Sequence, residues 1–383
     1  MIKAENFVEA ARELGFSRYT GVPCSYLTPF INYVINDDSL YYISSANEGD
    51  ALATAAGAAI GGERSVVMMQ NSGLGNAVSP LTSLTHIFRI PVLIIASHRG
   101  APGLNDEPQH RLMGQITGNL FELMRTPWEF FPEEENEIMP ALQRALDYML
   151  REYRPYCFIM KKGTVAAHAL NRTSIPAGRK SNKISAMVDG KNVPASRSEV
   201  LKKILMKTPG ENTVIIATTG YTGRELFALN DRVNHLYMVG SMGCASSLGL
   251  GLALARSDLT VVVIDGDGAA LMRMGNFATI GTYAGSNLVH VLLDNEVHDS
   301  TGAQATVAGN VAFGEIAAAC GYGLVYSGND PGVIDQIFTY DSADGPRFVH
   351  MKTKPGTIKN LPRPDKAPED VLRRLMKHIG TAF

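Results

Sequence analysis

Residues 261–302 read VVVIDGDGAALMRMGNFATIGTYAGSNLVHVLLDNEVHDSTG and hold two apolar runs, each followed by a turn with acid or amide side chains. The first run, residues 261–264, is continuous instead of alternating, which favours a parallel strand buried on both faces. It leads into GDG at 266–268, where the glycines permit a sharp turn and the carboxylate of Asp267 projects from the strand's carboxyl edge. The stretch therefore predicts a buried strand followed by a helix that begins near Ala269.

The second run, residues 288–293, is followed by Asp294 and Asn295, and 26 residues (269–294) separate Gly268 from Asn295. That length fits a helix and a return to a neighbouring parallel strand. Asp267 and Asn295 would then lie at the tips of adjacent strands, where a carboxylate and an amide oxygen suit Mg²⁺. The free N–H groups at the start of the helix favour an anion such as a phosphate. Two ordinary turns without a ligand are the alternative for this pattern alone.

The composition is that of a globular protein with room for two domains: 383 residues, 45% hydrophobic and 19% charged, with 37 glycines. A formal net charge of −2 gives no general attraction to nucleic acid or to an anionic membrane. The four cysteines form no CxxC pair, which argues against a zinc site or a disulfide framework and favours a reducing cytoplasm. No apolar run approaches the roughly 20 residues that span a bilayer, so we expect no membrane partner.

Strand and helix patterns alternate along the chain, which predicts an α/β fold made of doubly wound parallel sheets. A polar, basic stretch divides them, so we expect a first domain at 1–165, a linker at 166–195 and a second domain at 196–383. The first 15 residues predict an amphipathic helix that stops at Gly15, and not a signal peptide. Ser196 and Glu199 form a capping-box pattern. Strands are expected near residues 41, 66–69, 92–96, 157–160, 214–217, 236–239, 261–264, 288–293 and 348–351.

The stretch at 261–302 resembles the metal- and diphosphate-binding motif of thiamine diphosphate enzymes, in which GDG is followed after some two dozen residues by an asparagine. The resemblance implies that Asp267 and Asn295 are side-chain ligands of Mg²⁺ and that the carbonyl of Val297 is a third ligand. It also implies that Gly268 and Ala269 contact the cofactor. Because the resemblance covers nearly the whole chain, it implies a pyrimidine-binding domain, a diphosphate-binding domain and no third domain between them.

One other turn of the second domain matches the same family, and a second, in which Thr and Gly are common without any ligand, is interpreted from its residues alone. The resemblance assigns the backbone carbonyl of Gly240 to the aminopyrimidine and makes Met242 the wedge beneath the bent cofactor. Close helix packing and a buried core methionine are the ordinary interpretations of those residues. An earlier turn offers hydroxyl and N–H groups to a terminal phosphate through Thr218, Thr219, Gly220, Tyr221 and Thr222.

The first domain matches the family at three places. Glu48 opens an Ala-rich helix, where a carboxylate often only complements the helix dipole, but it matches the family's cofactor glutamate. That match implies a hydrogen bond to a pyrimidine ring nitrogen, which lets the cofactor act as its own general base. Asn71 and Ser72 lie in a turn that resembles the pyrimidine-side loop. Ser25 stands where the family places a small polar catalytic residue, which in some relatives is aspartate.

Two strings, NDEPQH at 105–110 and DNEVHDSTG at 294–302, resemble those of the decarboxylases that convert 3-phosphonopyruvate to phosphonoacetaldehyde and CO₂. This reaction belongs to phosphonate biosynthesis. An anionic 2-oxo acid requires a local supply of positive charge and hydrogen-bond donors, for which the candidates are His98, Arg99, His110 and His298. We favour His110 and His298 because they lie inside the two strings, and expect Asp106 to orient one of them or to relay a proton.

The resemblance also implies an active site shared between subunits, so the minimum active unit is expected to be a homodimer. Sulfopyruvate or another acidic 2-oxo acid is the alternative substrate. A dinucleotide-binding oxidoreductase is the alternative from another class, but no GxGxxG opens the first strand–helix–strand unit. A non-catalytic subunit of the same fold is a third alternative, opposed by the presence of Glu48, Asp267 and Asn295.

Overall fold

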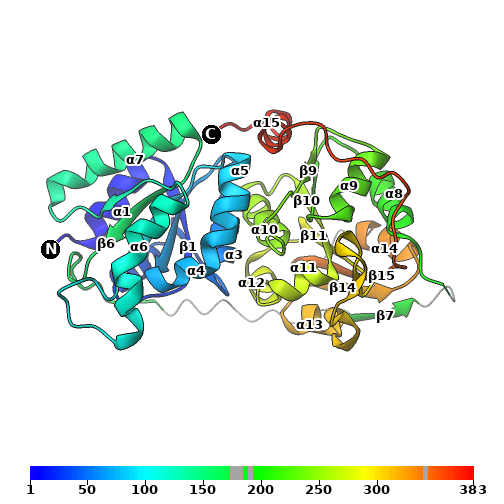
Figure 1. Cartoon of the computed structure of the whole chain (residues 1–383), viewed down its shortest axis with the longest axis horizontal. Helices are drawn as coiled ribbons and strands as arrows, with labels where there is room; N and C mark the ends of the chain where they lie inside the picture. Colours follow the sequence, from blue (N-terminus) through cyan, green and yellow to red (C-terminus); the bar gives the residue numbers. More distant parts are fainter. Residues whose placement is uncertain (173–183, 189–192, 340–343) are drawn as a thin grey trace. The chain divides into compact units, whose positions relative to one another are not determined.

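The computed structural model describes residues 1–172, 184–188, 193–339 and 344–383. The chain divides into two compact units, Met1–Ile175 and Pro176–Ala382. Each unit is built on one parallel sheet with helices on both faces (Figure 1). The predicted α/β class with two doubly wound parallel sheets is therefore confirmed.

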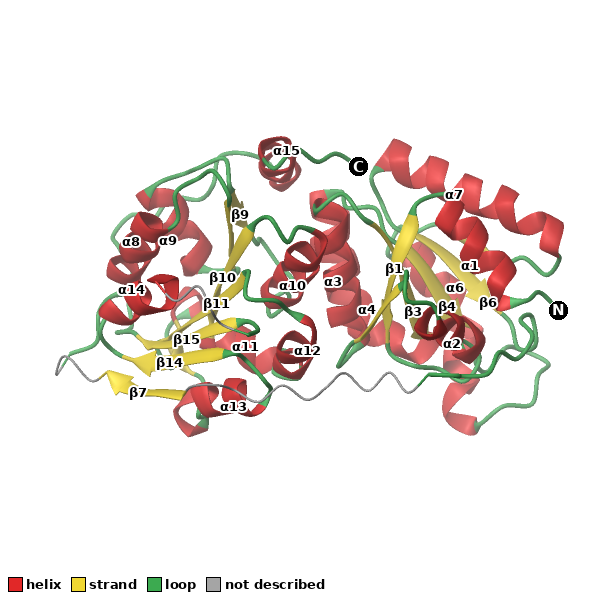
Figure 2. Ribbon diagram, turned by 180° about the vertical axis from the view of Figure 1, so that it is seen from behind, coloured by secondary structure: helices red, strands yellow, loops and turns green. Residues whose placement is uncertain are grey.

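The first unit contains a six-stranded sheet. Its strands are β1 (Phe16–Gly21), β2 (Tyr41–Ser44), β3 (Arg64–Gln70), β4 (Leu93–Ser97), β5 (Trp128–Phe130) and β6 (Tyr156–Met160). They lie in the order β2-β1-β3-β4-β6-β5, and every pair is parallel. Its helices are α1 (Ala4–Glu13), α2 (Thr28–Asn36), α3 (Glu48–Ile60), α4 (Leu74–Pro80), α5 (His86–Phe88), α6 (Arg111–Leu123) and α7 (Ile138–Glu152). In Figure 2, α1 and α7 lie on one side of this sheet and α3 and α4 on the other.

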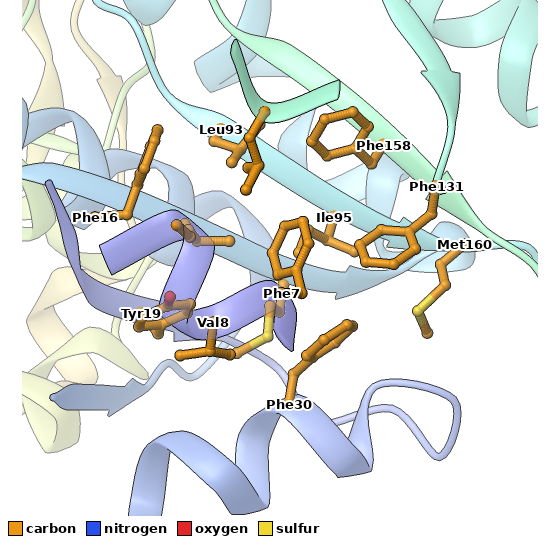
Figure 3. Packing of buried hydrophobic residues seen from close by; sticks show 14 of the residues in the cluster. Phe7, Val8, Phe16, Tyr19, Phe30, Leu93, Ile95, Phe131, Phe158 and Met160 are labelled. Carbon is orange, nitrogen blue, oxygen red and sulfur yellow. The ribbon is translucent and has the colours of Figure 1, made fainter. Parts of the chain in front are cut away.

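An aromatic cluster fills the core between α1 and this sheet, where Phe7 points toward Phe30 and Phe131 (Figure 3). The ring centroid of Phe7 lies 4.7 Å from that of Phe131 and 5.3 Å from that of Phe30. Fully burying one such ring contributes about 1.5–3 kcal/mol to the free energy of unfolding. The helix ends before Gly15, whose φ of +86° is left-handed, as the sequence predicted.

The second unit contains a seven-stranded sheet. Its strands are β7 (Ile184–Val188), β8 (Thr213–Ala217), β9 (His235–Tyr237), β10 (Thr260–Gly266), β11 (Leu288–Asp294), β14 (Leu324–Gly328) and β15 (Arg347–Lys352). They lie in the order β7-β14-β15-β11-β10-β8-β9, and every pair is parallel. A separate hairpin pairs β12 (Val297–His298) with β13 (Gln304–Ala305).

The helices of the second unit cover both faces of its sheet. They are α8 (Arg197–Lys207), α9 (Tyr221–Leu229), α10 (Ala245–Ala255), α11 (Asp267–Met272), α12 (Asn276–Tyr283), α13 (Phe313–Ala319), α14 (Gly332–Thr339) and α15 (Pro368–His378). Figure 1 shows α8, α9 and α14 on one face and α10, α12 and α13 on the other. The predicted capping box of Ser196 and Glu199 starts α8. Over the described ranges, no helix combines the length and the apolarity needed to cross a membrane.

Every predicted strand overlaps an observed one, but the sequence patterns missed β1, β5, β7 and β14. In β1 the polar Arg18 interrupts the pattern, and its side chain is buried because it pairs with Glu63 at 2.5 Å. The stretch 166–195 is predicted to be a linker, and its residues 173–183 and 189–192 lie outside those that the structure describes. Its residues 184–188 form β7, which pairs with β14, and Ala166 N donates to Ile2 O within the first unit.

The predicted pairing of the two apolar runs is confirmed. Strands β10 and β11 are parallel neighbours, with Gly266 opposite Leu293. Helix α11 begins at Asp267 itself, two residues before the predicted start. Because neighbouring parallel strands end at the same edge of a sheet, this register brings Asp267 and Asn295 to that edge together.

Candidate active site

The second unit gathers several of the expected site residues at the carboxyl edge of its sheet. Gly268, in the first turn of α11, lies against the side chains of His298 and Met242. A Cβ added to Gly268 would lie 2.5 Å from Cε1 of His298 and 3.1 Å from Cε of Met242. No larger residue fits at this point without moving both neighbours. The GDG turn, the methionine expected to be the wedge and the expected substrate histidine thus lie together.

The turn proposed for a terminal phosphate lies at the same edge. Gly220 caps the start of α9 in a left-handed conformation, with φ of +93°. A Cβ on Gly266 would lie 4.0 Å from Cγ2 of Thr218, and one on Gly220 would lie 3.6 Å from Oγ of Ser300. The loops after β8, β10 and β11 therefore meet, as binding sites at the carboxyl ends of parallel strands require.

Asp267 is almost completely buried, with 3% of its surface exposed. Burial raises the pKa of its carboxyl group, and a 2.5 Å hydrogen bond from Thr306 Oγ1 to Oδ2 acts in the opposite direction. The nearby Asp294 raises the pKa further. A bound cation would offset the cost of keeping this carboxylate ionised, which fits the residue to a metal site.

Asn295 is also buried, and its amide is fixed at both ends. Nδ2 donates to Oδ2 of Asp299 at 2.7 Å, and Oδ1 accepts from the backbone N–H of Val297 at 3.3 Å. No group of three or more His, Cys, Asp or Glu side chains in the described ranges is arranged to hold a metal. The expected site uses one carboxylate, one amide oxygen and one backbone carbonyl, which is the oxygen chemistry that Mg²⁺ prefers.

In the first unit, Glu48 is the first residue of α3 and only 8% of its surface is exposed. The preceding Asn47 caps the helix, because its Oδ1 accepts from the N–H groups of Gly49 and Asp50 at 2.9 and 3.1 Å. Oε2 of Glu48 accepts from Nδ2 of Asn76 at 2.8 Å. The carboxylate is thus held in one orientation at the end of α3.

The pyrimidine-side turn contains one buried polar atom without a partner. Asn71 is fully buried, and its Nδ2 donates to the carbonyl of Arg99 at 2.9 Å and to Oγ1 of Thr117 at 3.0 Å. Its Oδ1 has no hydrogen-bond partner among the described residues. A ligand N–H group could satisfy this acceptor. Ser72 is exposed and accepts from Gln70.

Asp106, expected to orient a histidine or to relay a proton, binds an arginine in the structure. Its carboxylate binds the guanidinium of Arg99 through two hydrogen bonds of 2.7 and 2.5 Å, instead of orienting a histidine. It also accepts from the backbone N–H groups of Gly100 and Glu107, each at 2.9 Å. Arg99 holds the pKa of Asp106 well below its usual range. The lowered pKa favours the ionised carboxylate at neutral pH.

Arg99 links Asp106 to the other expected residues of the first unit. Its Nη1 donates to Oγ of the exposed Ser25 at 3.2 Å, and its guanidinium lies 4.8 Å from the ring centroid of Tyr26. The ring of His98 is held by a different contact, because its Nε2 donates to the carbonyl of Gly114 at 2.7 Å.

His110 is buried at the turn before α6. Its Nδ1 has no hydrogen-bond partner within the part of the chain that the structure describes. A buried ring nitrogen in this state can still bind a ligand or move a proton.

The expected residues fall into two sets, one in each unit. Glu48, Asn71, Ser72, Ser25 and His110 belong to the first unit, and the Mg²⁺ and phosphate residues belong to the second. Sequence reasoning missed the residues that hold these groups. Gly73 and Asn76 follow Asn71 closely in the chain, so a signal existed for them. Thr306 is 39 residues from Asp267 and gave none.

Known proteins were compared with the chain. Residues 1–120 match the N-terminal TPP binding domain of thiamine pyrophosphate enzymes, and residues 219–351 match the C-terminal TPP binding domain. Thiamine pyrophosphate is thiamine diphosphate by another name. The chain therefore belongs to the family of thiamine pyrophosphate enzymes, as its sheet-edge motif implied.

Three relatives that align with this chain over nearly its full length are decarboxylases. A phosphonopyruvate decarboxylase of Streptomyces viridochromogenes is 42% identical over 383 residues, covering 100% of this chain and 96% of that protein. One of Streptomyces hygroscopicus is 41% identical, covering 98% and 93%. A sulfopyruvate decarboxylase of Methanosarcina acetivorans is 29% identical, covering 98% and 97%.

Among solved structures, a thiamine diphosphate-dependent 4-hydroxybenzoylformate decarboxylase of Rhodococcus jostii RHA1 is similar, with a TM-score of 0.71. The alignment covers 92% of this chain and 99% of the solved chain. The sequence identity is 12%, so the similarity supports the fold alone.

Proposed function

We propose that this chain is a carboxy-lyase that uses thiamine diphosphate and Mg²⁺ to convert 3-phosphonopyruvate to phosphonoacetaldehyde and CO₂. The observation that carries the proposal is the meeting of Gly268, Met242 and His298 beside Asp267 and Asn295, in a chain similar over its full length to phosphonopyruvate decarboxylases. The residues present fit the cofactor and the metal. Burial raises the pKa of Asp267, and among the described residues the buried Oδ1 of Asn71 has no donor.

The second unit would hold the metal and the diphosphate. Asp267, Asn295 and the carbonyl of Val297 supply oxygen ligands for Mg²⁺. The turn at 218–222 supplies hydroxyl and N–H groups for the terminal phosphate. Gly268 and Ala269 in the first turn of α11 would contact the diphosphate, and Gly240 and Met242 would contact the ring system.

The first unit would activate the cofactor. Bound thiamine diphosphate supplies the electron sink for the loss of CO₂. Glu48 holds and passes a proton at a pyrimidine nitrogen, and the hydrogen bond from Asn76 keeps its carboxylate in place for that task.

The substrate would be bound and protonated by basic groups from both sets. The reaction consumes one proton at the carbon that loses the carboxylate, and His110 and His298 are the groups proposed to deliver it. Arg99 and Ser25 supply hydrogen-bond donors for the anionic groups. Arg99 is pre-organised because Asp106 and Tyr26 fix its guanidinium before substrate arrives.

The proposal includes a homodimer, or a larger homo-oligomer, in a cytoplasmic setting. Its support is the division of the expected residues between the two units, with Glu48 in one and the metal ligands in the other. Light scattering at the concentration of the activity assay checks this point. A fully active monomer would contradict it.

The decisive experiment measures CO₂ and aldehyde release from 3-phosphonopyruvate, sulfopyruvate and pyruvate, with thiamine diphosphate and Mg²⁺ present. We expect a clear preference for 3-phosphonopyruvate and loss of activity when a chelator removes the metal. Turnover of none of the three, despite cofactor binding, would refute the proposed substrate and leave the family assignment standing.

Sulfopyruvate is the second candidate substrate, because a sulfopyruvate decarboxylase is also similar over its full length. A sulfonate carries one negative charge where a phosphonate carries up to two. A higher kcat/KM for sulfopyruvate than for 3-phosphonopyruvate would favour this candidate.

A further inference from the structure

A buried ionic network stands behind the expected metal ligand Asn295. Asp299 accepts three hydrogen bonds: from Asn295 Nδ2 at 2.7 Å, from Arg197 Nη2 at 2.5 Å and from the backbone N–H of Gly356 at 3.1 Å. Only 7% of the Asp299 side chain is exposed. Its carboxylate is therefore fixed by donors from three separate segments of the second unit.

The network continues through Arg197 to Glu225. Nη1 of Arg197 donates to Oε1 of Glu225 at 2.8 Å, and 7% and 1% of these two side chains are exposed. Thr357 and Ser198 donate to the same carboxylate at 2.7 and 2.6 Å. Arg197 thus holds two buried carboxylates with the two arms of one guanidinium, a geometry that lysine does not reproduce.

The chemistry of an amide explains why this network matters for a metal. An asparagine side chain presents an oxygen at one end and an NH₂ group at the other, and only the oxygen can bind Mg²⁺. An ionised carboxylate only accepts hydrogen bonds, so Asp299 engages Nδ2 and leaves Oδ1 as the end available to a cation. Groups that orient a metal ligand in this way commonly set the affinity of the site.

We propose that Asp299, itself held by Arg197, is the positioning residue that orients the amide of Asn295 and thereby sets the Mg²⁺ affinity of the site. The inference rests on the proposed function, in which Asn295 is a metal ligand. The two residues act through Asn295 and do not contact the metal. Together with the N–H of Val297, which donates to Oδ1 at 3.3 Å, they remove the rotational choice that an unrestrained amide would have.

The test measures Mg²⁺ binding by calorimetry to the full chain at saturating thiamine diphosphate, and turnover against Mg²⁺ concentration. Asp299→Asn keeps the shape but can both donate and accept, so it no longer selects one end of the Asn295 amide. We expect its dissociation constant for Mg²⁺ to rise by about 10–100-fold, with turnover recovering at saturating Mg²⁺. A role confined to folding would lower the active fraction without changing the Mg²⁺ concentration at half-maximal turnover.

Arg197→Lys is the milder second variant. If Asp299→Asn does not fold, the Mg²⁺ affinity of Arg197→Lys tests the proposal instead. One ammonium group cannot hold both carboxylates, so its Mg²⁺ affinity should fall in the same direction. Ser198→Ala is the matched control, because it removes a hydrogen bond to Glu225 at the far end of the network. Its Mg²⁺ affinity should equal that of the wild type.

The outcomes separate this inference from the function it rests on. If wild-type protein with thiamine diphosphate binds no Mg²⁺, the proposed function fails. If the wild type binds Mg²⁺ and the folded variants bind it equally well, the inference alone is overturned.

Discussion

Gly73 lies directly against the carboxylate of Glu48, and a Cβ added to Gly73 would overlap the end of that side chain. The φ of Gly73 is −69°, so its backbone is one that any residue adopts. A glycine is needed here because the Glu48 carboxylate approaches its Cα closely, and not because the turn requires an unusual backbone conformation. It joins the pyrimidine-side turn to the first residue of α3, and this contact lies entirely within the first unit.

Replacing Gly73 by alanine should displace the Glu48 carboxylate, because the flexible end of that side chain yields more easily than the backbone. We expect a folded protein whose turnover falls by up to about 10²–10⁴-fold, the range of general acid–base contributions. Gly75→Ala is the matched control, since its added Cβ meets no heavy atom within 4 Å. Equal kcat values for the two variants would show that the contact is unimportant.

Replacing Glu48 by glutamine should keep the shape and remove the acid. Turnover should fall by about 10²–10⁴-fold, while Mg²⁺-dependent cofactor binding persists because its ligands lie in the second unit. Steady-state rates and calorimetric titration with thiamine diphosphate check the two halves of this prediction. Near-normal turnover would remove Glu48 from its assigned role.

Mg²⁺ affinity should decline as the pH falls, because a proton on Asp267 competes with the metal. Burial raises the pKa of this carboxyl group, so the decline should begin at a higher pH than for an ordinary aspartate. Thr306→Val deletes the hydrogen bond that lowers this pKa and should move the decline to still higher pH. Mg²⁺ titrations at a series of pH values test this, and an identical profile in the two proteins would contradict it.

Asp106 should stabilise the fold at neutral pH and lose that effect in acid. The hydrogen bonds from Arg99 lower its folded pKa, so its contribution is present above the unfolded pKa of about 3.9 and vanishes as the pH falls through the folded value. The stability deficit of Asp106→Asn should therefore be full at pH 7 and shrink below about pH 4.

Urea midpoints at several pH values measure this deficit. Asp38→Asn is the control, because Asp38 pairs with Arg172 on the surface with 80% of its side chain exposed, and such pairs contribute little. A deficit for Asp106→Asn that does not change with pH would contradict the prediction.

The sequence by itself determined the fold class and the edge of the sheet at which the expected metal ligands lie. A parallel strand buried on both faces has a nearly continuous apolar sequence, so the runs at 261–264 and 288–293, the second interrupted only by His290, identified β10 and β11 without knowledge of their neighbours. The sequence also predicted two helix ends correctly from single turns: Gly15 after α1 and the Ser196 capping box at the start of α8. All of these depend on interactions between residues close in the chain.

Only the tertiary structure decided which groups hold the site residues in place. Arg197 reaches Asp299 across 102 positions, and no local periodicity encodes that pairing. Asp106 lies near both Arg99 and His110 in the sequence, and only the folded loop shows that it binds the arginine. Strand β7 is recognisable only through its partner β14. For Arg197 and β7 the physical reason is that the partner comes from a distant segment, which a local hydrophobic pattern does not record. For Asp106 the reason is that the fold of one loop chooses between two neighbours that are both close in the chain.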